Sequence, residues 1–269
     1  MAALSSKAPK VSIITVCFNS DSTIRDTLSS VQSQGYSKIE HIIVDGGSSD
    51  NTMNIVSEYK SSLGPVLSEP DKGLYDAMNK GIGMANGDII GILNSDDFYE
   101  SDDVIEVAVA AFLSNSDVDI VFGDLVFVNS QNLEKITRFY RAGHFRPWKL
   151  RFGWMPPHPA TFVTKAAYEK HGKYRLDMKI SADYEMFVRW LSKEKLKYVW
   201  VDQVMVRMRV GGVSTRGLKN SLILNREIVR ACKENGLYTN FLFVLTKIPF
   251  KCLELLRLSK HVKNQGKYL

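Results

Sequence analysis

Two adjacent carboxylates, Asp96 and Asp97, follow an apolar run in the segment GILNSDD at residues 91–97, with Asn94 just before them. Asn, Ser and Asp favour turns, so the end of a strand is one explanation for this segment. Oxygen ligands at a strand end also suit a divalent cation, because hard cations bind carboxylate and carbonyl oxygens. The segment therefore predicts either a turn or a metal site, and the rest of the chain bears on the choice.

Three further polar positions follow or adjoin apolar runs. Asn19 comes after VSIITVCF, Asp45 follows IEHIIV, and Asp71 lies in SEPDKG ahead of a helical stretch. In open parallel sheets, ligands bind at the carboxyl ends of strands. Carboxylates that converge there repel one another unless a cation or hydrogen-bond donors compensate. A lone Asp of this kind is most simply a turn or cap residue, whereas the whole set favours a binding site.

Apolar runs alternate with helical repeats through the first half of the chain. Residues 11–18 form a β-branched run typical of a strand buried on both faces, and Ile24, Leu28 and Val31 then repeat at helical spacing. Further strands are expected at 39–47, 65–69, 87–93 and 118–128, and further helices at 48–59, 73–85 and 102–113. This alternation predicts an α/β fold with a mainly parallel sheet.

The second half is less regular but continues the same unit. We expect a strand entering a helix at 160–172, a helix at 181–193 capped by Ser181, a long strand or strand pair at 196–210, and a helix at 218–236. No linker is evident before residue 237. The sequence therefore predicts one domain at 1–237, followed by a basic amphipathic helical tail at 238–269.

Charge and cysteine content exclude some classes of protein. The net charge is +6, but residues 238–269 carry six Lys/Arg and one acid, so the other 237 residues are nearly balanced. A nucleic-acid-binding fold needs a basic face of its own, so we expect no nucleic-acid partner. Three scattered cysteines argue against a zinc site and a disulfide framework, and favour a reducing compartment. The first residues lack an apolar stretch of the secretory type, which predicts a cytoplasmic location.

Four blocks of the chain resemble family 2 glycosyltransferases in order and spacing: VSIITVCFN, IIVDGGSSDNT, EPDKGLYDAMNKGI and GDIIGILNSDD. More narrowly, EPDKGLYDAMNKGI and LNSDD resemble the bacterial polysaccharide-assembly branch that includes colanic acid biosynthesis enzymes. The resemblance covers about residues 10–215. It implies a GT-A fold for the domain, a nucleotide-sugar donor, Mn²⁺ or Mg²⁺, and metal-dependent, inverting transfer of a sugar.

The resemblance also implies roles for residues near the donor. Asp45 matches the acid that hydrogen-bonds the base, with Thr15 and Asn19 near the nucleotide. Asp71 matches an acid near the ribose and base. For the donor we expect a UDP-sugar ahead of a GDP-sugar, although the sugar itself depends on the shape of the pocket.

NSDD lies where the family has its DxD element, with Asn94 in place of the first acid. Asp96 and Asp97 would then hold the ribose and the metal that bridges the diphosphate. Mg²⁺ is often bound through few protein carboxylates plus phosphate oxygens, so the loss of one acid is compatible with metal binding.

A candidate general base lies in ISADYEMFVRW at residues 180–190. This segment resembles the family block whose aspartate deprotonates the acceptor, which assigns that role to Asp183, although Ala182 replaces the usual glutamate. Inverting transfer requires the acceptor hydroxyl to lose its proton as it attacks, and a carboxylate within hydrogen-bond reach can accept it. The alternative is that Asp183 only fills the first turn of a helix, where the helix dipole favours acids.

Two further segments carry candidate residues. VRMRVGGVSTRG resembles a Gly-Gly-x-Ser loop that closes over the donor, with Ser214 as its serine and Arg209 placed to meet phosphate oxygens. A surface turn is the alternative. GWMPPHPATF places His158 where the branch has a histidine facing the acceptor or diphosphate, and Trp154 where an indole could stack on a sugar. A buried structural histidine and a core tryptophan are the alternatives.

The tail mixes Phe, Leu and Val with lysines at helical spacing, interrupted by Lys247, Pro249 and Lys251. It is too interrupted for a transmembrane helix, which needs about 20 mostly apolar residues. An amphipathic helix on an anionic membrane surface fits better. It would suit a lipid-linked saccharide acceptor and a peripheral position on the inner face of the plasma membrane. Packing on the domain or on a second subunit of a homo-oligomer is the alternative.

Other functional classes fit less of the pattern. A nucleotidyltransferase would carry a Gly-rich phosphate loop after the first strand, and CFNSDST has no glycine. A dinucleotide-dependent dehydrogenase is excluded because no GxGxxG follows that strand. A non-catalytic nucleotide-sugar-binding or scaffolding protein of the same fold remains an alternative, because Asn94 and Ala182 stand where the family has acids.

Overall fold

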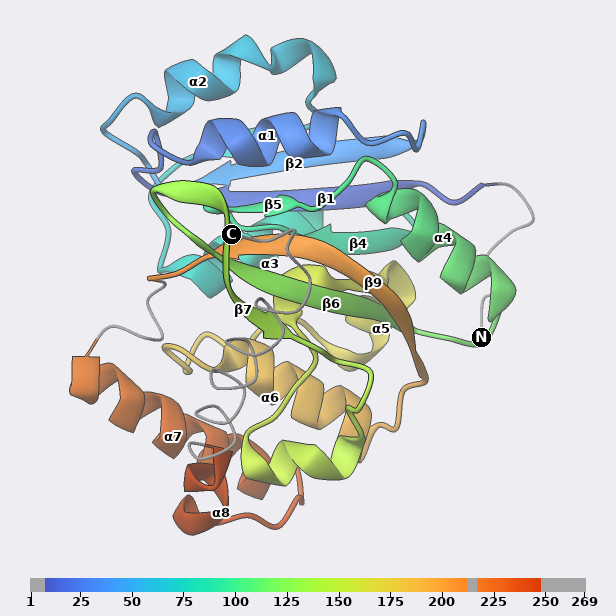
Figure 1. Ribbon diagram of the computed structural model, residues 1–269, viewed down its shortest axis with the longest axis vertical. Coiled ribbons are helices and arrows are strands. Elements are labelled where there is room, and N and C mark those ends of the chain that lie inside the picture. The colour runs from blue at the N-terminus through green and yellow to red at the C-terminus, as the bar shows by residue number, and fades with distance from the viewer. Residues whose placement is uncertain (1–7, 212–216, 248–269) are drawn as a thin grey trace.

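The computed structural model describes residues 8–211 and 217–247. Within these residues, nine strands form one sheet in the order β3-β2-β1-β4-β8-β6-β9-β5, and β7 pairs with β6 outside this path (Figure 1). The strands are β1 (Val11–Cys17), β2 (Ile39–Asp45), β3 (Val66–Ser68), β4 (Ile89–Ile92), β5 (Asp97–Tyr99), β6 (Ile120–Asn129), β7 (Asn132–Tyr140), β8 (Thr161–Thr164) and β9 (Tyr198–Arg209).

The strand directions bring most carboxyl ends to one edge of the sheet, called here the carboxyl edge. β3, β2, β1 and β4 are parallel neighbours, and β6 is parallel to β9. β8 is antiparallel to both β4 and β6, so β6 points the same way as β4. The predicted α/β fold with a mainly parallel sheet is confirmed. The antiparallel β8 also begins at this edge, because its direction is reversed.

Helices cover both faces of the sheet (Figure 1). Alternate side chains of a strand point to opposite faces, so Ile13 packs in the core beneath α1 and α4, whereas Ile14 packs with α3, α5, α6 and α7. The helices are α1 (Ile24–Gln32), α2 (Thr52–Glu58), α3 (Leu74–Met84), α4 (Val104–Ser114), α5 (Lys165–His171), α6 (Ala182–Val188), α7 (Gly217–Glu234) and α8 (Phe241–Leu245). Short helical turns are η1 (Lys60–Ser62), η2 (Pro147–Phe152), η3 (His158–Ala160) and the π-helical η4 (Arg189–Lys193).

A buried carboxylate fixes the opposite, amino edge of the sheet. Glu40 on β2 accepts hydrogen bonds from Lys10 Nζ at 2.8 Å, from Ser12 Oγ at 2.6 Å and from Asn86 N at 2.9 Å. Burial alone would raise the pKa of Glu40, but these donors outweigh it and lower the pKa to about 2. Gly87 follows immediately and donates its N–H to Ser12 Oγ. This edge therefore ties β1, β2 and the start of β4 together.

Some predicted boundaries were wrong. Asp97 does not end a strand but begins β5, and neither β5 nor β7 was expected. The side chain of Ser181 makes no capping hydrogen bond to α6, and the expected helix at 181–193 changes to a π-helical turn after Val188. The domain boundary at 237 stays a prediction, and Val244 on α8, beyond that residue, is fully buried in the main hydrophobic cluster. Residues 248–269 of the predicted tail lie outside the described residues.

The amino edge gives a stability prediction. Gly87→Ala should lower the free energy of unfolding by about 1–3 kcal/mol, because overpacking forces backbone shifts. The new methyl would lie 2.6 Å from Ser12 N and 2.8 Å from Lys10 O, which are both backbone atoms. Urea denaturation measures the change. Gly35→Ala is the control, since a Cβ there meets nothing closer than 3.7 Å. Equal unfolding midpoints for the two variants would contradict the prediction.

Candidate functional site

The loops that follow β1, β2 and β4 are joined by hydrogen bonds at the carboxyl edge. Asn19, with a left-handed φ of 47°, donates its N–H to Ser48 Oγ at 2.8 Å and accepts from Ser49 N at 2.9 Å through its side chain. Ser20 Oγ lies 2.8 Å from Ser95 Oγ. Three segments far apart in the sequence therefore form one connected rim. The Asn19 residue itself is exposed on it.

Two residues predicted to contact the nucleotide are buried beneath this rim. Asp45 is fully buried and accepts hydrogen bonds from Ser48 Oγ at 2.5 Å and Ser68 Oγ at 2.6 Å. Burial alone would raise its pKa, but these donors lower it, so the carboxylate stays charged and holds the turn after β2. Thr15 is also fully buried and lies 2.9 Å from His41 Nε2. The structure therefore gives both side chains internal partners.

Asp71 and Phe18 lie close to the backbone of Gly46. A Cβ added at Gly46 would be 2.6 Å from Asp71 Oδ2 and 3.5 Å from Phe18 Cδ2. Asp71 is partly exposed, and its Oδ1 accepts the N–H of Gly73 at 2.7 Å. Phe18 is 62% exposed, although it is a large apolar side chain. An exposed ring beside a carboxylate is suited to a ligand with a flat, polar ring system.

The two acids of NSDD have different surroundings. Asp96 is partly exposed at the rim, whereas Asp97 is fully buried and neither of its carboxylate oxygens has a hydrogen-bond partner among residues 8–211 and 217–247. Burial, and then the charge of Asp96, raises the pKa of Asp97 well above its usual range. Asn94 Oδ1 is likewise buried without a partner. Of the two predicted metal ligands, only Asp96 is open to the rim.

A metal would therefore need oxygen atoms from a ligand. Among residues 8–211 and 217–247, no three His, Cys, Asp or Glu side chains cluster to hold a metal ion. The unpartnered amide oxygen of Asn94 and the partly exposed carboxylate of Asp96 are nevertheless hard oxygen donors. Mg²⁺ is commonly held by one or two carboxylates plus phosphate oxygens. The residues present fit a cation that is shared with a bound diphosphate.

Arg209 holds the NSDD loop from β9. Its guanidinium donates to the backbone oxygen of Asp96 at 2.6 Å, forms an ion pair with Asp26 and lies 5.2 Å from the ring centroid of Phe98. Only 7% of the side chain is exposed. These contacts give Arg209 a supporting role beneath Asp96, and its predicted contact with a donor phosphate stays a prediction. Ser214, predicted for the same loop, lies outside the described residues.

Asp183, the predicted base, stands at the start of α6. Its Oδ1 accepts the hydroxyl of Tyr75 at 3.2 Å and the N–H of Tyr184 at 2.8 Å. Burial raises the pKa of Asp183, although the charge of His158 and these two hydrogen bonds oppose the rise. Tyr75 belongs to the first turn of α3, just after Asp71. Asp183 is thus held at the carboxyl edge on which Asp71 and Asp96 lie.

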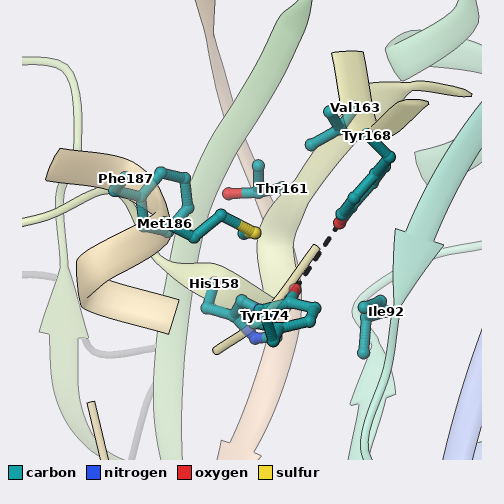
Figure 2. A pocket seen from close by; sticks show the side chains of 8 residues that line it. All are labelled: Ile92, His158, Thr161, Val163, Tyr168, Tyr174, Met186 and Phe187. Carbon is teal, nitrogen blue, oxygen red and sulfur yellow. Dashed lines mark hydrogen bonds between the residues drawn. The ribbon is translucent and has the colours of Figure 1, made fainter. Parts of the chain in front are cut away.

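His158 belongs to an aromatic cluster behind Asp183. Its Nε2 lies 2.7 Å from Tyr174 Oη, and the ring of Tyr174 stacks on Tyr75 with centroids 5.6 Å apart. Figure 2 shows His158 and Tyr174 side by side in a narrow pocket that has no room for a water molecule, with Tyr168 reaching toward the same hydroxyl. Burial lowers the pKa of His158 against the opposing charge of Asp183. A neutral imidazole that supports the base is the role these contacts favour.

Trp154 is partly exposed and packs on Tyr140 with ring centroids 6.4 Å apart. The hydroxyl of Tyr140 donates to the backbone oxygen of Met155 at 2.7 Å. Trp154 therefore has one face against the protein, and no contact in the described residues brings it to Asp183. Its predicted stacking on a sugar stays a prediction.

Glu227 on α7 clamps the backbone just before Asp183. Its carboxylate accepts the N–H groups of Lys179 at 2.7 Å, Ile180 at 3.0 Å and Ser181 at 3.0 Å. The carbonyl of Ile180 in turn accepts the Tyr75 hydroxyl at 2.6 Å. Asp183 therefore follows a turn that is fixed from α3 on one side and from α7 on the other.

Four residues of this site were not predicted from the sequence: Phe18, Tyr75, Tyr174 and Glu227. A signal existed for two of them, because Phe18 adjoins Asn19 and Tyr75 lies in the EPDKGLYDAMNKGI block. Glu227 carries no such sequence signal, because a glutamate on an amphipathic helix usually faces solvent. In the sequence, Tyr174 cannot be distinguished from an ordinary core aromatic residue. Its functional position beside His158 becomes visible only in the folded structure.

Removing the Glu227 carboxylate should destabilise the fold. Glu227→Ala leaves three backbone N–H groups without their acceptor, and hydrogen bonds to a charged group contribute about 1.5–3 kcal/mol. Glu227→Gln should cost less, because one acceptor oxygen remains. Chemical denaturation measures both. Glu169→Ala, an exposed site on α5, is the control. The clamp is refuted if Glu227→Ala unfolds at the same urea concentration as that control.

Comparison with known proteins agrees with this geometry. Residues 12–171 match the family model described as Glycosyl transferase family 2. An uncharacterized glycosyltransferase of Mycobacterium tuberculosis (strain CDC 1551 / Oshkosh) is 35% identical over 187 residues, which cover 68% of this chain and 69% of the relative. A PGL/p-HBAD biosynthesis glycosyltransferase of Mycobacterium bovis (strain BCG / Pasteur 1173P2) is 29% identical over 245 residues, covering 89% of this chain and 91% of the relative.

Solved structures share the fold at low identity. S. aureus TarS 1–349 in complex with UDP-GlcNAc has a TM-score of 0.61 at 19% identity, over 82% of this chain and 66% of that chain. The mannosyltransferase PcManGT from Pyrobaculum calidifontis, in complex with GDP-Man and Mn²⁺, has a TM-score of 0.61 at 18% identity. The match covers 86% of this chain and 67% of that chain. This chain thus spans about two thirds of the length of each. With the family model covering more than half of its residues, the chain belongs to glycosyl transferase family 2 and has the GT-A fold.

Proposed function

We propose that this glycosyltransferase moves a sugar, with inversion, from a nucleotide-diphosphate sugar to a saccharide acceptor, and that Asp183 is the general base. The observation that carries the proposal is the position of Asp183. It lies at the carboxyl edge, next to the helix that follows Asp71, and Tyr75 and the Glu227 clamp fix its orientation. Burial raises its pKa, which makes the carboxylate a stronger base.

The proposed chemistry is a single displacement. The acceptor hydroxyl transfers its proton to a carboxylate oxygen of Asp183 while the hydroxyl oxygen attacks the anomeric carbon. The bond from that carbon to the donor's diphosphate breaks on the opposite side, so the configuration inverts. The hydroxyl of Tyr75 holds Asp183 in place, and His158 supports Tyr75 indirectly through Tyr174.

The donor is proposed to bind along the rim. Phe18, Asn19 and Asp71 offer a ring face, an amide and a carboxylate to the nucleoside, and a UDP-sugar is favoured over a GDP-sugar. Asp45 acts indirectly, through the turn that it holds. Asp96, with Asn94 beside it, would hold Mn²⁺ or Mg²⁺. When bound, such a cation neutralises charge on a departing diphosphate. Structures of the same fold with UDP-GlcNAc, and with GDP-Man and Mn²⁺, support a donor of this class.

The acceptor is proposed to be a lipid-linked saccharide of a bacterial surface polysaccharide. The support is the resemblance of EPDKGLYDAMNKGI and LNSDD to enzymes of that branch and the basic charge of residues 238–269. No helix in the described part of the chain is long and apolar enough to cross a membrane. A peripheral position at the membrane is therefore part of the proposal, with oligomerisation left as the competing role of the tail.

The role of Asp183 can be tested by isosteric replacement. Asp183→Asn should lower kcat by about 10²–10⁴-fold, the usual contribution of a general base, while donor binding is retained. Turnover of UDP-sugars and the melting shift with UDP are the two measurements. Asp102→Asn, on an exposed carboxylate beyond β5, is the matched control. Full turnover in Asp183→Asn would show that Asp183 is not the general base. UDP binding without turnover in the native protein would favour the non-catalytic alternative.

The pH profile tests the same residue independently. Because the base must be deprotonated, kcat/KM should fall as the pH drops through the pKa of Asp183, which burial places above that of an ordinary aspartate. The Tyr75 hydrogen bond stabilises the charged carboxylate and lowers this pKa. Tyr75→Phe should therefore move the acidic limb of the profile to higher pH. A limb that stays in place, or moves to lower pH, would show that Tyr75 does not act through Asp183.

Metal binding at Asp96 is tested by thermal stabilisation. A ligand that binds only the native state stabilises it by RT ln(1 + [L]/Kd), so UDP should raise the melting temperature, and Mn²⁺ should enlarge that rise. Asp96→Asn should abolish the enlargement by Mn²⁺ and keep most of the rise with UDP alone. Asp102→Asn again serves as the control. If Mn²⁺ enlarges the UDP shift equally in Asp96→Asn, the metal is not held at Asp96.

A further inference from the structure

A patch of exposed apolar side chains lies where η2 meets α8, at the end of the molecule opposite α2 (Figure 1). Four large side chains define this η2–α8 surface, with exposed fractions of 55% for Trp148, 68% for Tyr238, 40% for Phe241 and 72% for Leu242. Single exposed apolar residues are ordinary on a protein surface, but contiguous ones mark an interaction site.

Ring contacts link Trp148 to Tyr238 through Phe152 and Phe243, and Phe241 and Leu242 directly precede Phe243 on α8. Trp148 meets Phe152 edge to face with centroids 5.9 Å apart, Phe152 stacks on Phe243 at 5.1 Å, and Phe243 meets Tyr238 edge to face at 6.0 Å. Val244, the residue after Phe243, is fully buried and anchors α8 to the domain. The exposed side chains therefore project from a fixed platform.

The surroundings of this surface are cationic. A groove of about 440 Å³ opens beside Trp148, with Arg151 and Lys195 on its walls, and none of its lining residues is acidic. Lys149 Nζ lies 5.8 Å from the ring centroid of Trp148. Within the described residues, no carboxylate forms an ion pair with these three basic side chains. Partial burial, and then the charge of Arg146, lowers the pKa of Lys149, which agrees with an excess of positive charge here.

We propose that the η2–α8 surface docks on an anionic lipid bilayer. Trp148 and Leu242 enter the interface between headgroups and acyl chains, where aromatic and aliphatic side chains are stabilised. Lys149, Arg151 and Lys195 then meet lipid phosphates. A bilayer is the partner that offers an apolar layer and a dense negative charge side by side, which is the complement of this surface. The inference does not rest on the proposed reaction, since it needs neither donor nor acceptor.

The test is flotation of the full chain with vesicles, without any nucleotide. The native protein should float with phosphatidylcholine vesicles that contain about 30% phosphatidylglycerol, and less with pure phosphatidylcholine. The double variant Trp148→Ser, Leu242→Ser should partition about tenfold or more weakly. Leu113→Ser, Leu176→Ser is the matched control, because both leucines are exposed elsewhere, at 48% and 54%.

A charge variant separates the two contributions. Lys149→Glu, Lys195→Glu should also weaken binding by about tenfold, and only on the anionic vesicles, whereas Lys60→Glu on the distant η1 should have no effect. Unchanged melting temperatures and unchanged UDP binding show that each variant is folded. The proposal is overturned if both double variants float like the native chain, which would assign binding to residues 248–269. It is also overturned if the native chain ignores anionic vesicles and forms a dimer that Trp148→Ser dissociates.

Discussion

β1 pairs in parallel with β2 on one side and with β4 on the other, and this pairing determines where the loops of the carboxyl edge lie. With Val11 opposite both Ile39 and Ile89, the three strands start in step at the amino edge. Their loops must then emerge together at the other edge, where each strand ends within a short distance of its neighbour. The buried Glu40 cluster fixes that common start. A slip of one residue would turn every apolar side chain of a strand to the wrong face, so the register is strongly specified.

The aspartates at the carboxyl edge differ in function because their surroundings differ. Asp45 has several hydrogen-bond donors and remains a charged structural group inside the protein. Asp97 is fully buried beside the charge of Asp96, so its own charge is disfavoured. Asp183 lies between these extremes, with two donors and a desolvated setting. The same type of side chain therefore has three different electrostatic environments at one edge of the sheet. Sequence position alone does not distinguish these states.

The sequence predicted the strands around β1 because strands buried on both faces appear as uninterrupted apolar runs. It missed β5 and β7, since β5 has three residues and the side chains of β7 are mostly polar or half-buried. It placed Asp71 and Asp96 at one edge through their order and spacing, whereas Asp183 came from the resemblance of its segment. The roles predicted for Asp45, Thr15 and Arg209 stay predictions, and the internal hydrogen bonds of Thr15 and Arg209 could not be foreseen because their partners lie far away in the chain. Glu227 could not be found, because its acceptor role depends on how α7 packs, 44 positions after Asp183 in the chain.

Consecutive elements near the end of the domain support the two sides of the site. β9 ends at Arg209, which holds the backbone of Asp96, and α7 carries Glu227, which holds the turn before Asp183. Both contacts act on the backbone, so a substitution at Arg209 or Glu227 would change where Asp96 or Asp183 lies without removing either carboxylate. The last strand and the long helix therefore set the geometry of an edge whose carboxylates are supplied by earlier residues.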